Sequence, residues 1–129
     1  MYLPLSEKEE YLGKQIVDAA FRVPKELGPG LLEKIYEECF CYELRKREIE
    51  IYRQVYLPIK YDNVTFDLGL KLDVYVENEI ICELKAQEGF NSLWKAQLIS
   101  HLKLTGNRLG FLINFNTPLI KDGITRIIV

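Results

Sequence analysis

The sequence predicts an α/β fold in which a mixed β-sheet is flanked by helices, in the order α-α-β-β-β-α-β-β. Three observations predict it: two apolar stripes at helical spacing near the N-terminus, a series of extended segments bounded by turn residues, and a third helical segment between extended segments. This arrangement is typical of a sheet with helices packed against it. With 129 residues, of which 48% are hydrophobic, the chain fits one domain over residues 1–129.

The two N-terminal helices are expected to form a hairpin. The first begins after Ser6, where Glu9 completes a capping pattern and apolar residues follow at helical spacing. Residues 27–30, with the sequence Leu-Gly-Pro-Gly, end this helix. The second helix is expected to end near Arg47. Its predicted inner stripe contains Leu32, Ile35, Tyr36, Cys39, Phe40 and Leu44.

The rest of the chain is expected to supply the strands and the third helix. Residues 49–59 alternate and predict a strand up to Pro58, a turn follows at 61–63, and residues 64–66 resume the extended chain. Two further strands flank Asn78. The third helix is predicted from about Ser92 to Thr105, where Gly106 stops it, and residues 109–115 and 124–129 form the last strands.

Charged residues interrupt the two apolar strands around Asn78. Side chains two residues apart on a strand share a face, so Glu83 and Lys85 point the same way. A loop centred on Asn78 places Asp73 opposite Glu83, whereas a turn shifted by half a step places the two carboxylates on opposite faces. We favour the register centred on Asn78.

In that register the two carboxylates predict a divalent-metal site with a lysine beside it. Carboxylates about 5 Å apart at Cβ repel each other unless a cation or a proton lies between them. The alternative interpretation is a solvated face of an antiparallel sheet, on which carboxylates and lysines are common.

Charge and cysteine usage restrict the class of protein. The 17 basic and 19 acidic residues give a formal net charge of −2, so any contact with nucleic acid has to be local. The three cysteines (Cys39, Cys41 and Cys82) lack metal-ligand spacing and are expected to be reduced, which favours a cytoplasmic location. The N-terminal residues 1–7 lack a signal-peptide pattern, and no stretch approaches the length of a membrane span.

Two motifs carry a resemblance to a known family. The segment from Gly30 through Glu33 to Tyr36 has the pattern Gly-x-x-Glu-x-x-Tyr, and Asp73 is followed by the tripeptide 83–85, Glu-Leu-Lys. Together they resemble the GxxExxY proteins of the PD-(D/E)XK nuclease-like superfamily. The resemblance covers nearly the whole chain and implies a small fold with an α-β-β-β-α-β core.

The resemblance implies a metal-dependent nuclease or nuclease-like domain whose expected substrate is DNA, with RNA as the alternative. Asp73 and Glu83 would hold Mg²⁺ or Mn²⁺, whose preferred ligands are carboxylate oxygens. Lys85 would orient or help deprotonate the attacking water and offset charge on the phosphate. Glu33 would support the metal or its water, although a carboxylate in the first turn of a helix is also favoured by the helix dipole alone. Gln97 would contact the site from the third helix.

Two positions depart from the pattern of similar nucleases. Some of these carry Gln-x-x-x-Tyr in the third helix, whereas here Gln97 is followed by His101, the only histidine of the chain. We interpret His101 as a packed helix residue. Lys71 occupies a position where many relatives have arginine. The positive charge is kept, but a lysine cannot form the bidentate hydrogen bonds that an arginine makes to a phosphate.

Two other functions stay open. One is a catalytically inactive nuclease-fold module that binds a protein or nucleic-acid partner, and the other is a structural domain with an unused site. No membrane partner is expected. The sequence leaves the oligomeric state open, with a homodimer among the alternatives.

Overall fold

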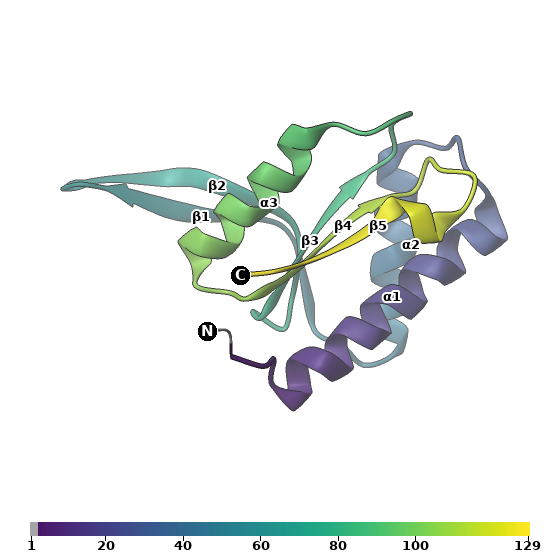
Figure 1. Cartoon of the computed structure of the whole chain (residues 1–129), viewed down its shortest axis with the longest axis horizontal. Coiled ribbons are helices and arrows are strands. Elements are labelled where there is room, and N and C mark those ends of the chain that lie inside the picture. The colour runs from purple at the N-terminus through teal and green to yellow at the C-terminus, as the bar shows by residue number, and fades with distance from the viewer. Residues whose placement is uncertain (1–2) are drawn as a thin grey trace.

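The computed structural model describes residues 3–129 and confirms the predicted order of helices and strands (Figure 1). Met1 and Tyr2, which open the segment without a signal-peptide pattern, lie outside the described residues. In the described part of the chain, no helix is both long and apolar enough to cross a membrane. The elements are α1 (Glu7–Leu27), α2 (Glu33–Lys46), β1 (Ile51–Tyr61), β2 (Val64–Val76), β3 (Ile80–Lys85), α3 (Ser92–Thr105), β4 (Leu109–Asn114), the short 3-10 helix η1 (Ile120–Gly123) and β5 (Ile124–Ile128).

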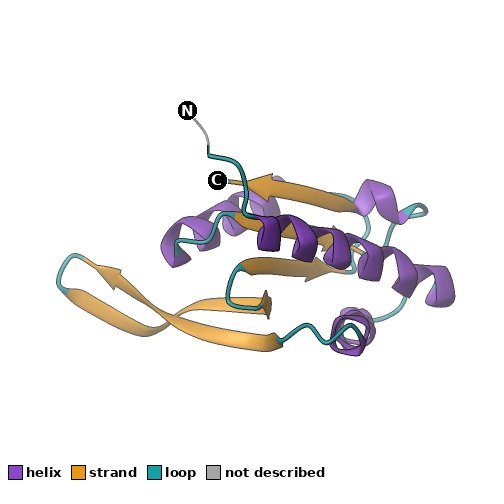
Figure 2. Cartoon of the chain, turned by 90° about the horizontal axis from the view of Figure 1, so that it is seen from below, coloured by secondary structure: helices purple, strands orange, loops and turns teal. Residues whose placement is uncertain are grey.

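The strands form one mixed five-stranded sheet in the order β1-β2-β3-β4-β5 (Figure 2). Strands β3 and β4 pair in parallel, and the three other pairs are antiparallel. A parallel pair needs a crossover, and α3 forms it between β3 and β4.

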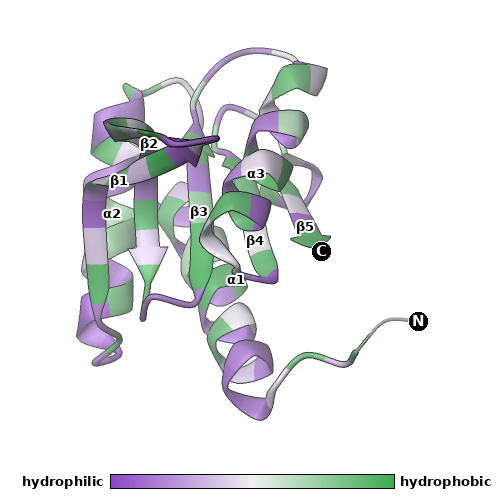
Figure 3. Cartoon of the chain, turned by 90° about the vertical axis from the view of Figure 1, so that its left-hand side faces the viewer, coloured by the Kyte–Doolittle hydropathy of each residue, from purple (hydrophilic) through white to green (hydrophobic). Residues whose placement is uncertain are grey.

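Two apolar cores lie on opposite faces of the sheet. The core under α1 and α2 contains Cys82 and Leu84 of β3, and the core under α3 contains Ile81 of the same strand. Because side chains alternate along a strand, Glu83 and Lys85 share the α3 face with Ile81. Figure 3 shows the hydrophobic start of β3 changing to hydrophilic colour toward its end. The polar side chains of Glu83 and Lys85, at the end of β3, therefore point to the face of the sheet that α3 covers.

The ends of α1 and α3 form as the sequence predicts. The hydroxyl of Ser6 accepts a hydrogen bond from the backbone N–H of Glu9 at 3.0 Å, and the carboxylate of Glu9 accepts one from the N–H of Ser6 at 2.8 Å. These two bonds satisfy donors that the first turn of a helix leaves free. Gly106 ends α3 with a φ of 77°, a left-handed conformation that glycine adopts without strain.

Strand β2 is longer than predicted, and its exposed residues 64–69 form, with the part of β1 that pairs with them, an arm that projects from the rest of the fold (Figure 1). Residues 64–66 and the strand before Asn78 belong to one continuous strand, β2. Strand β1 continues through Pro58, because β1 is at the edge of the sheet, where a strand can lack a donor. The outer part of the arm exposes four large apolar side chains: Tyr61, Val64, Phe66 and Leu68.

The predicted inner stripe of α2 is partly wrong. Leu32 and Ile35 are 76% and 43% exposed, whereas Glu37, which the apolar spacing left out, is buried. The carboxylate of Glu37 accepts hydrogen bonds from Arg53 at 2.7 Å and from Gln54 at 2.8 Å. These partners from β1 satisfy the charge, so α2 can turn a glutamate inward. The buried members of the predicted stripe are Tyr36, Phe40 and Leu44.

Candidate active site

The connection between β2 and β3 has the register that brings Asp73 and Glu83 together. Val76 pairs with Ile80, so the connection is centred on Asn78, as favoured from the sequence. Asn78 has a φ of 57°, in the left-handed region that asparagine tolerates better than most residues. Counted from this pair, Asp73 falls opposite Glu83 on the neighbouring strand.

Asp73 directs its carboxylate toward the backbone of β3. Its Oδ2 accepts a hydrogen bond from the backbone N–H of Leu84 at 2.9 Å. Leu84 lies between Glu83 and Lys85 in the sequence, so this bond fixes the Asp73 carboxylate beside both. The side chain of Asp73 is only partly buried, and its second oxygen lies outside this bond.

Glu83 is 6% exposed and contacts a residue of α3. Its Oε1 and Nδ1 of His101 are 2.9 Å apart. Burial raises the pKa of the Glu83 carboxyl, the hydrogen bond with His101 opposes that shift, and the charge of Asp73 adds to it, so that the pKa is about 7. Glu83 therefore holds its proton to a higher pH than an exposed glutamate does.

Lys85 follows on the same face of β3. Its Nζ lies 5.5 Å from the centre of the Trp94 ring on α3, which is within the range of a cation–π contact. The side chain is partly buried. Trp94 thus holds the ammonium group on the α3 side of the sheet, two residues along the strand from Glu83.

Glu33, the first residue of α2, is exposed at the surface beside these groups. Partial desolvation raises the pKa of its carboxyl, the charge of Asp73 raises it further, and Lys85 opposes the shift. These effects indicate that Glu33 of α2 lies within electrostatic range of Asp73 and Lys85. The structure therefore places Asp73, Glu83 and Lys85 on adjacent strands with Glu33 in the surroundings, and the roles of these four residues stay predictions.

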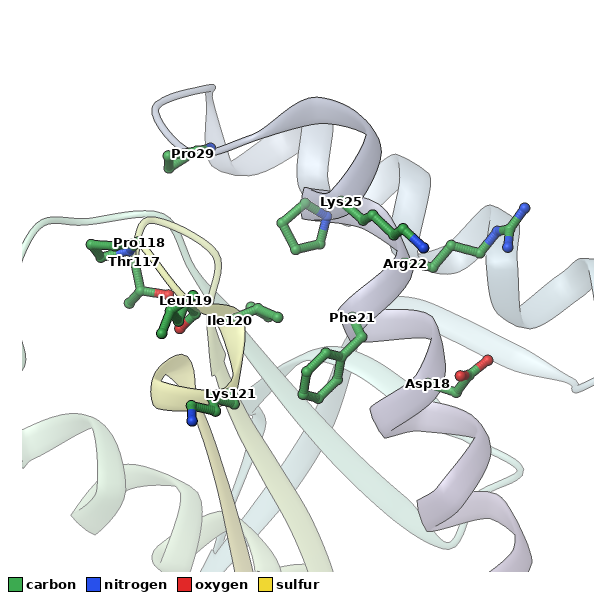
Figure 4. Close-up of a pocket in the computed structure, with 11 residues that line it drawn as sticks. Asp18, Phe21, Arg22, Lys25, Pro29, Thr117, Pro118, Leu119, Ile120 and Lys121 are labelled. Carbon is green, nitrogen blue, oxygen red and sulfur yellow. Dashed lines mark hydrogen bonds between the residues drawn. The ribbon is translucent and has the colours of Figure 1, made fainter.

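A separate cleft of about 510 Å³ lies between α1 and the connection from β4 to β5 (Figure 4). Phe21 and Lys25 of α1 line one side of it, and Leu119 and Lys121 line the other. None of the predicted site residues is among the residues that line this cleft. The cleft therefore forms no part of the candidate active site.

Comparison with known proteins assigns the chain to a family. A scan against protein-family models matched residues 10–127 to the PD-(D/E)XK nuclease superfamily. The chain belongs to this superfamily. Neither the curated proteins nor the solved structures gave a match.

Membership of the PD-(D/E)XK superfamily agrees with the mixed sheet and supports a nuclease-like function. The pattern in the superfamily's name has its counterpart in Asp73, Glu83 and Lys85, with Leu72 in place of the proline. The likeness to the GxxExxY proteins within the superfamily stays a resemblance.

His101 is the residue of this PD-(D/E)XK site that the sequence interpretation missed. It is packed, as expected, but its ring also contacts the carboxylate of Glu83. It shares the inner face of α3 with Trp94 and Leu98, and this spacing was the available signal. Gln97 lies on the exposed side of α3, one turn before His101, and its role stays a prediction.

Tyr36 supports the loop before Glu33 rather than Glu33 itself. Its hydroxyl donates a hydrogen bond to the carbonyl of Gly28 at 2.6 Å and accepts one from the N–H of Leu31 at 3.1 Å. Its ring stacks on Phe115 with a centroid distance of 5.0 Å. The tyrosine of the Gly-x-x-Glu-x-x-Tyr motif thus fixes the path of the chain into α2.

Glu33→Gln and Tyr36→Phe are expected to have different and additive effects. Glu33→Gln removes a carboxylate whose pKa is raised, so the free energy of unfolding of the metal-free protein should stay level or rise. Tyr36→Phe breaks both loop hydrogen bonds and should lower the free energy of unfolding by about 1–2 kcal/mol. Urea unfolding of each variant and of the double variant measures these changes, with the exposed Tyr42→Phe as the control. A coupling above about 0.5 kcal/mol would contradict their independence.

Proposed function

We propose that this chain is a metal-dependent nuclease that hydrolyses phosphodiester bonds in DNA, in the reducing setting of the cytoplasm. The observation that carries the proposal is the meeting of Asp73, Glu83 and Lys85 on adjacent strands in a chain of the PD-(D/E)XK nuclease superfamily. The free thiols of Cys39 and Cys82 agree with a reducing setting.

The donor set suits Mg²⁺ or Mn²⁺. Within residues 3–129, no group of three or more His, Cys, Asp or Glu side chains is arranged to hold a metal ion. Magnesium sites, however, commonly use one or two protein carboxylates and complete the coordination shell with water and substrate phosphates. Asp73 and Glu83 would supply those carboxylates, and Glu33, whose carboxyl is influenced by the charge of Asp73, would act on bound water. Burial is the main reason that the pKa values of Glu33 and Glu83 are raised, and the charge of Asp73 adds to both shifts. A divalent cation would offset the contribution of Asp73.

The chemistry follows from what each side chain can do. When bound, the metal would polarise the phosphodiester and lower the pKa of a coordinated water. Lys85, which contacts Trp94, would orient that water and offset negative charge that develops on the phosphate. His101 can accept a hydrogen bond from protonated Glu83 or donate one to its ionised form, so it supports Glu83 in either state.

Cleavage of labelled oligonucleotides tests the proposed function. The purified protein should cut DNA in Mg²⁺ or Mn²⁺ and not in EDTA, and Asp73→Asn should lower the rate by about 100-fold or more. Asparagine can still accept the hydrogen bond from Leu84, so the variant should fold. The exposed Asp67→Asn on the same strand is the matched control and should keep the wild-type rate.

The same assay with RNA of equal sequence shows which of the two substrates is cleaved faster. A folded wild-type protein that cuts neither DNA nor RNA would contradict the proposal.

A binding module is the second candidate, and one observation favours it. Both carboxylates of the site already have partners within the protein, Asp73 in Leu84 and Glu83 in His101. The exposed apolar residues at the end of the β1–β2 arm would suit a protein partner or a second copy of the chain. In that case Mn²⁺ should leave the melting temperature unchanged and no cleavage should occur.

A further inference from the structure

A second recess lies beside the candidate active site, on the same face of the sheet. We term it the Trp94 pocket. It has a volume of about 370 Å³, which falls within the range of small-molecule sites. It lies between the start of α3 and the strands β4 and β5, and its lining includes Phe90, Trp94, Leu112, Asn114, Asp122 and Thr125.

Trp94 is the wall that the pocket shares with the active site. One side of the indole contacts the ammonium of Lys85, and Phe90 packs against it edge-to-face with a centroid distance of 6.2 Å. In the parallel register of β3 and β4, Lys85 lies beside Asn114. Neighbouring strands are about 4.8 Å apart. The pocket therefore begins one strand away from Lys85, a separation that a single nucleotide can span between its phosphate and its base.

The wall that carries Phe90 is fixed by hydrogen bonds. The side-chain amide of Asn114, a residue only 6% exposed, donates to the carbonyls of Gln87 and Gly89 at 2.8 and 3.1 Å. Its oxygen accepts from the N–H of Gln87 at 3.3 Å. These bonds tie the segment before α3 to the end of β4. Phe90, which directly follows this segment, is nonetheless 68% exposed.

The charges around the pocket favour a neutral group over a phosphate. The charged residues that line it, Glu88 and Asp122, are both acidic. They would repel a phosphate, whereas their carboxylates can accept hydrogen bonds from the amino groups of a base. The cation that a phosphate needs, Lys85, is not among the residues that line the pocket, and its ammonium lies 5.5 Å from the centre of the Trp94 ring.

From this arrangement we propose that the Trp94 pocket receives one unpaired nucleobase of a single-stranded nucleic acid, stacked against Phe90, while the adjoining phosphate lies at Lys85. Bases that are read outside a duplex are held in this way, by aromatic side chains and by hydrogen bonds to their edges. The identity of the ligand rests on the proposed nuclease function, and the pocket narrows the substrate to strands with an unpaired base beside the phosphate to be cut.

Trp94 provides the test, because it is the only tryptophan of the chain. A single-stranded DNA octamer, titrated into the protein in EDTA so that no cleavage is needed, should change the fluorescence of Trp94. The anisotropy of a labelled octamer gives the affinity. Phe90→Ala should weaken binding about 10-fold or more, and Phe90→Tyr, which keeps an aromatic ring, should restore it. A blunt duplex of the same sequence should bind at least about 10-fold more weakly than the single strand.

Phe21→Ala is the matched control, since Phe21 is an exposed aromatic residue in the separate cleft of Figure 4. It should leave binding unchanged. The proposal is overturned if no octamer binds, if Phe90→Ala binds like the wild type, if Trp94 fluorescence does not respond, or if the duplex binds as tightly as the single strand. A cleavage assay in Mg²⁺ or Mn²⁺ separates the two proposals. If the protein cuts DNA without these binding results, only the proposal for the Trp94 pocket is rejected. If it shows these binding results without cutting, only the proposed nuclease function is rejected.

Discussion

Lys85→Ala is expected to slow DNA cleavage by about 100- to 10,000-fold while leaving Mn²⁺ binding nearly unchanged. The reason is the division of roles at the end of β3. In the proposed site, Asp73 and Glu83 would supply the oxygens for a cation, whereas the ammonium of Lys85, which lies over Trp94, would act on the water and the phosphate. Single-turnover cleavage at saturating Mn²⁺ measures the first effect, and the Mn²⁺-induced rise in melting temperature measures the second.

Two further variants sharpen this test. Lys85→Arg keeps the charge with a different shape and should recover part of the rate. Lys95→Ala removes an exposed lysine of α3, close to Lys85 in sequence, and should cleave like the wild type. Loss of the Mn²⁺ response in Lys85→Ala would show that the lysine maintains the metal site, and an undiminished rate would remove it from the chemistry.

Glu83→Gln is expected to raise the free energy of unfolding of the metal-free protein by up to about 3 kcal/mol at about pH 8. Burial places the pKa of Glu83 at about 7 in the folded protein, compared with an ordinary value of 4.5. Below the lower value, both the folded and the unfolded chain carry the proton. Between the two values the unfolded chain loses its proton while the folded chain keeps it, so stability falls by about 1.4 kcal/mol for each pH unit.

Urea unfolding across this pH range measures the change, and Glu83→Gln should flatten the profile. Glu26→Gln, at an exposed position near the end of α1, is the control and should keep the wild-type slope. If Glu83→Gln and the wild type have the same profile, Glu83 is not the group that titrates. At 100 times its dissociation constant, Mn²⁺ should raise the free energy of unfolding of the wild type by about 2.7 kcal/mol. At a fixed Mn²⁺ concentration this stabilisation should increase as pH rises, and Asp73→Asn should lose it.

The carboxylate pair and the lysine could be predicted because they depend on local rules. Strand alternation fixes the common face of Glu83 and Lys85, and the turn at Asn78 fixes the partner of Glu83. The order of helices and strands follows from caps, glycines and apolar spacing in the same way. These signals lie within a few residues of the features that they determine.

The features that the sequence did not give depend on contacts between distant elements. The contact of His101 with Glu83 depends on how α3 is turned over the sheet, which its apolar spacing defines only within about one residue. The inward turn of Glu37 needs Arg53 from another element. The full length of β2 was missed although residues 64–74 alternate between apolar residues and polar residues or glycine, the pattern of a strand, while residues 64–69 are exposed.

The place of β3 in the sheet has a consequence for the order in which this fold opens. Strand β3 is hydrogen-bonded to β2 on one side and to β4 on the other, and five of its six residues are buried. Amides in such a strand exchange with solvent mainly through opening of the whole fold, whereas the exposed outer part of the β1–β2 arm, beyond Leu70, exchanges through local fraying. Glu83 and Lys85 are therefore carried by a slowly exchanging part of the chain. Local fluctuations that open the arm leave the positions of these two residues intact.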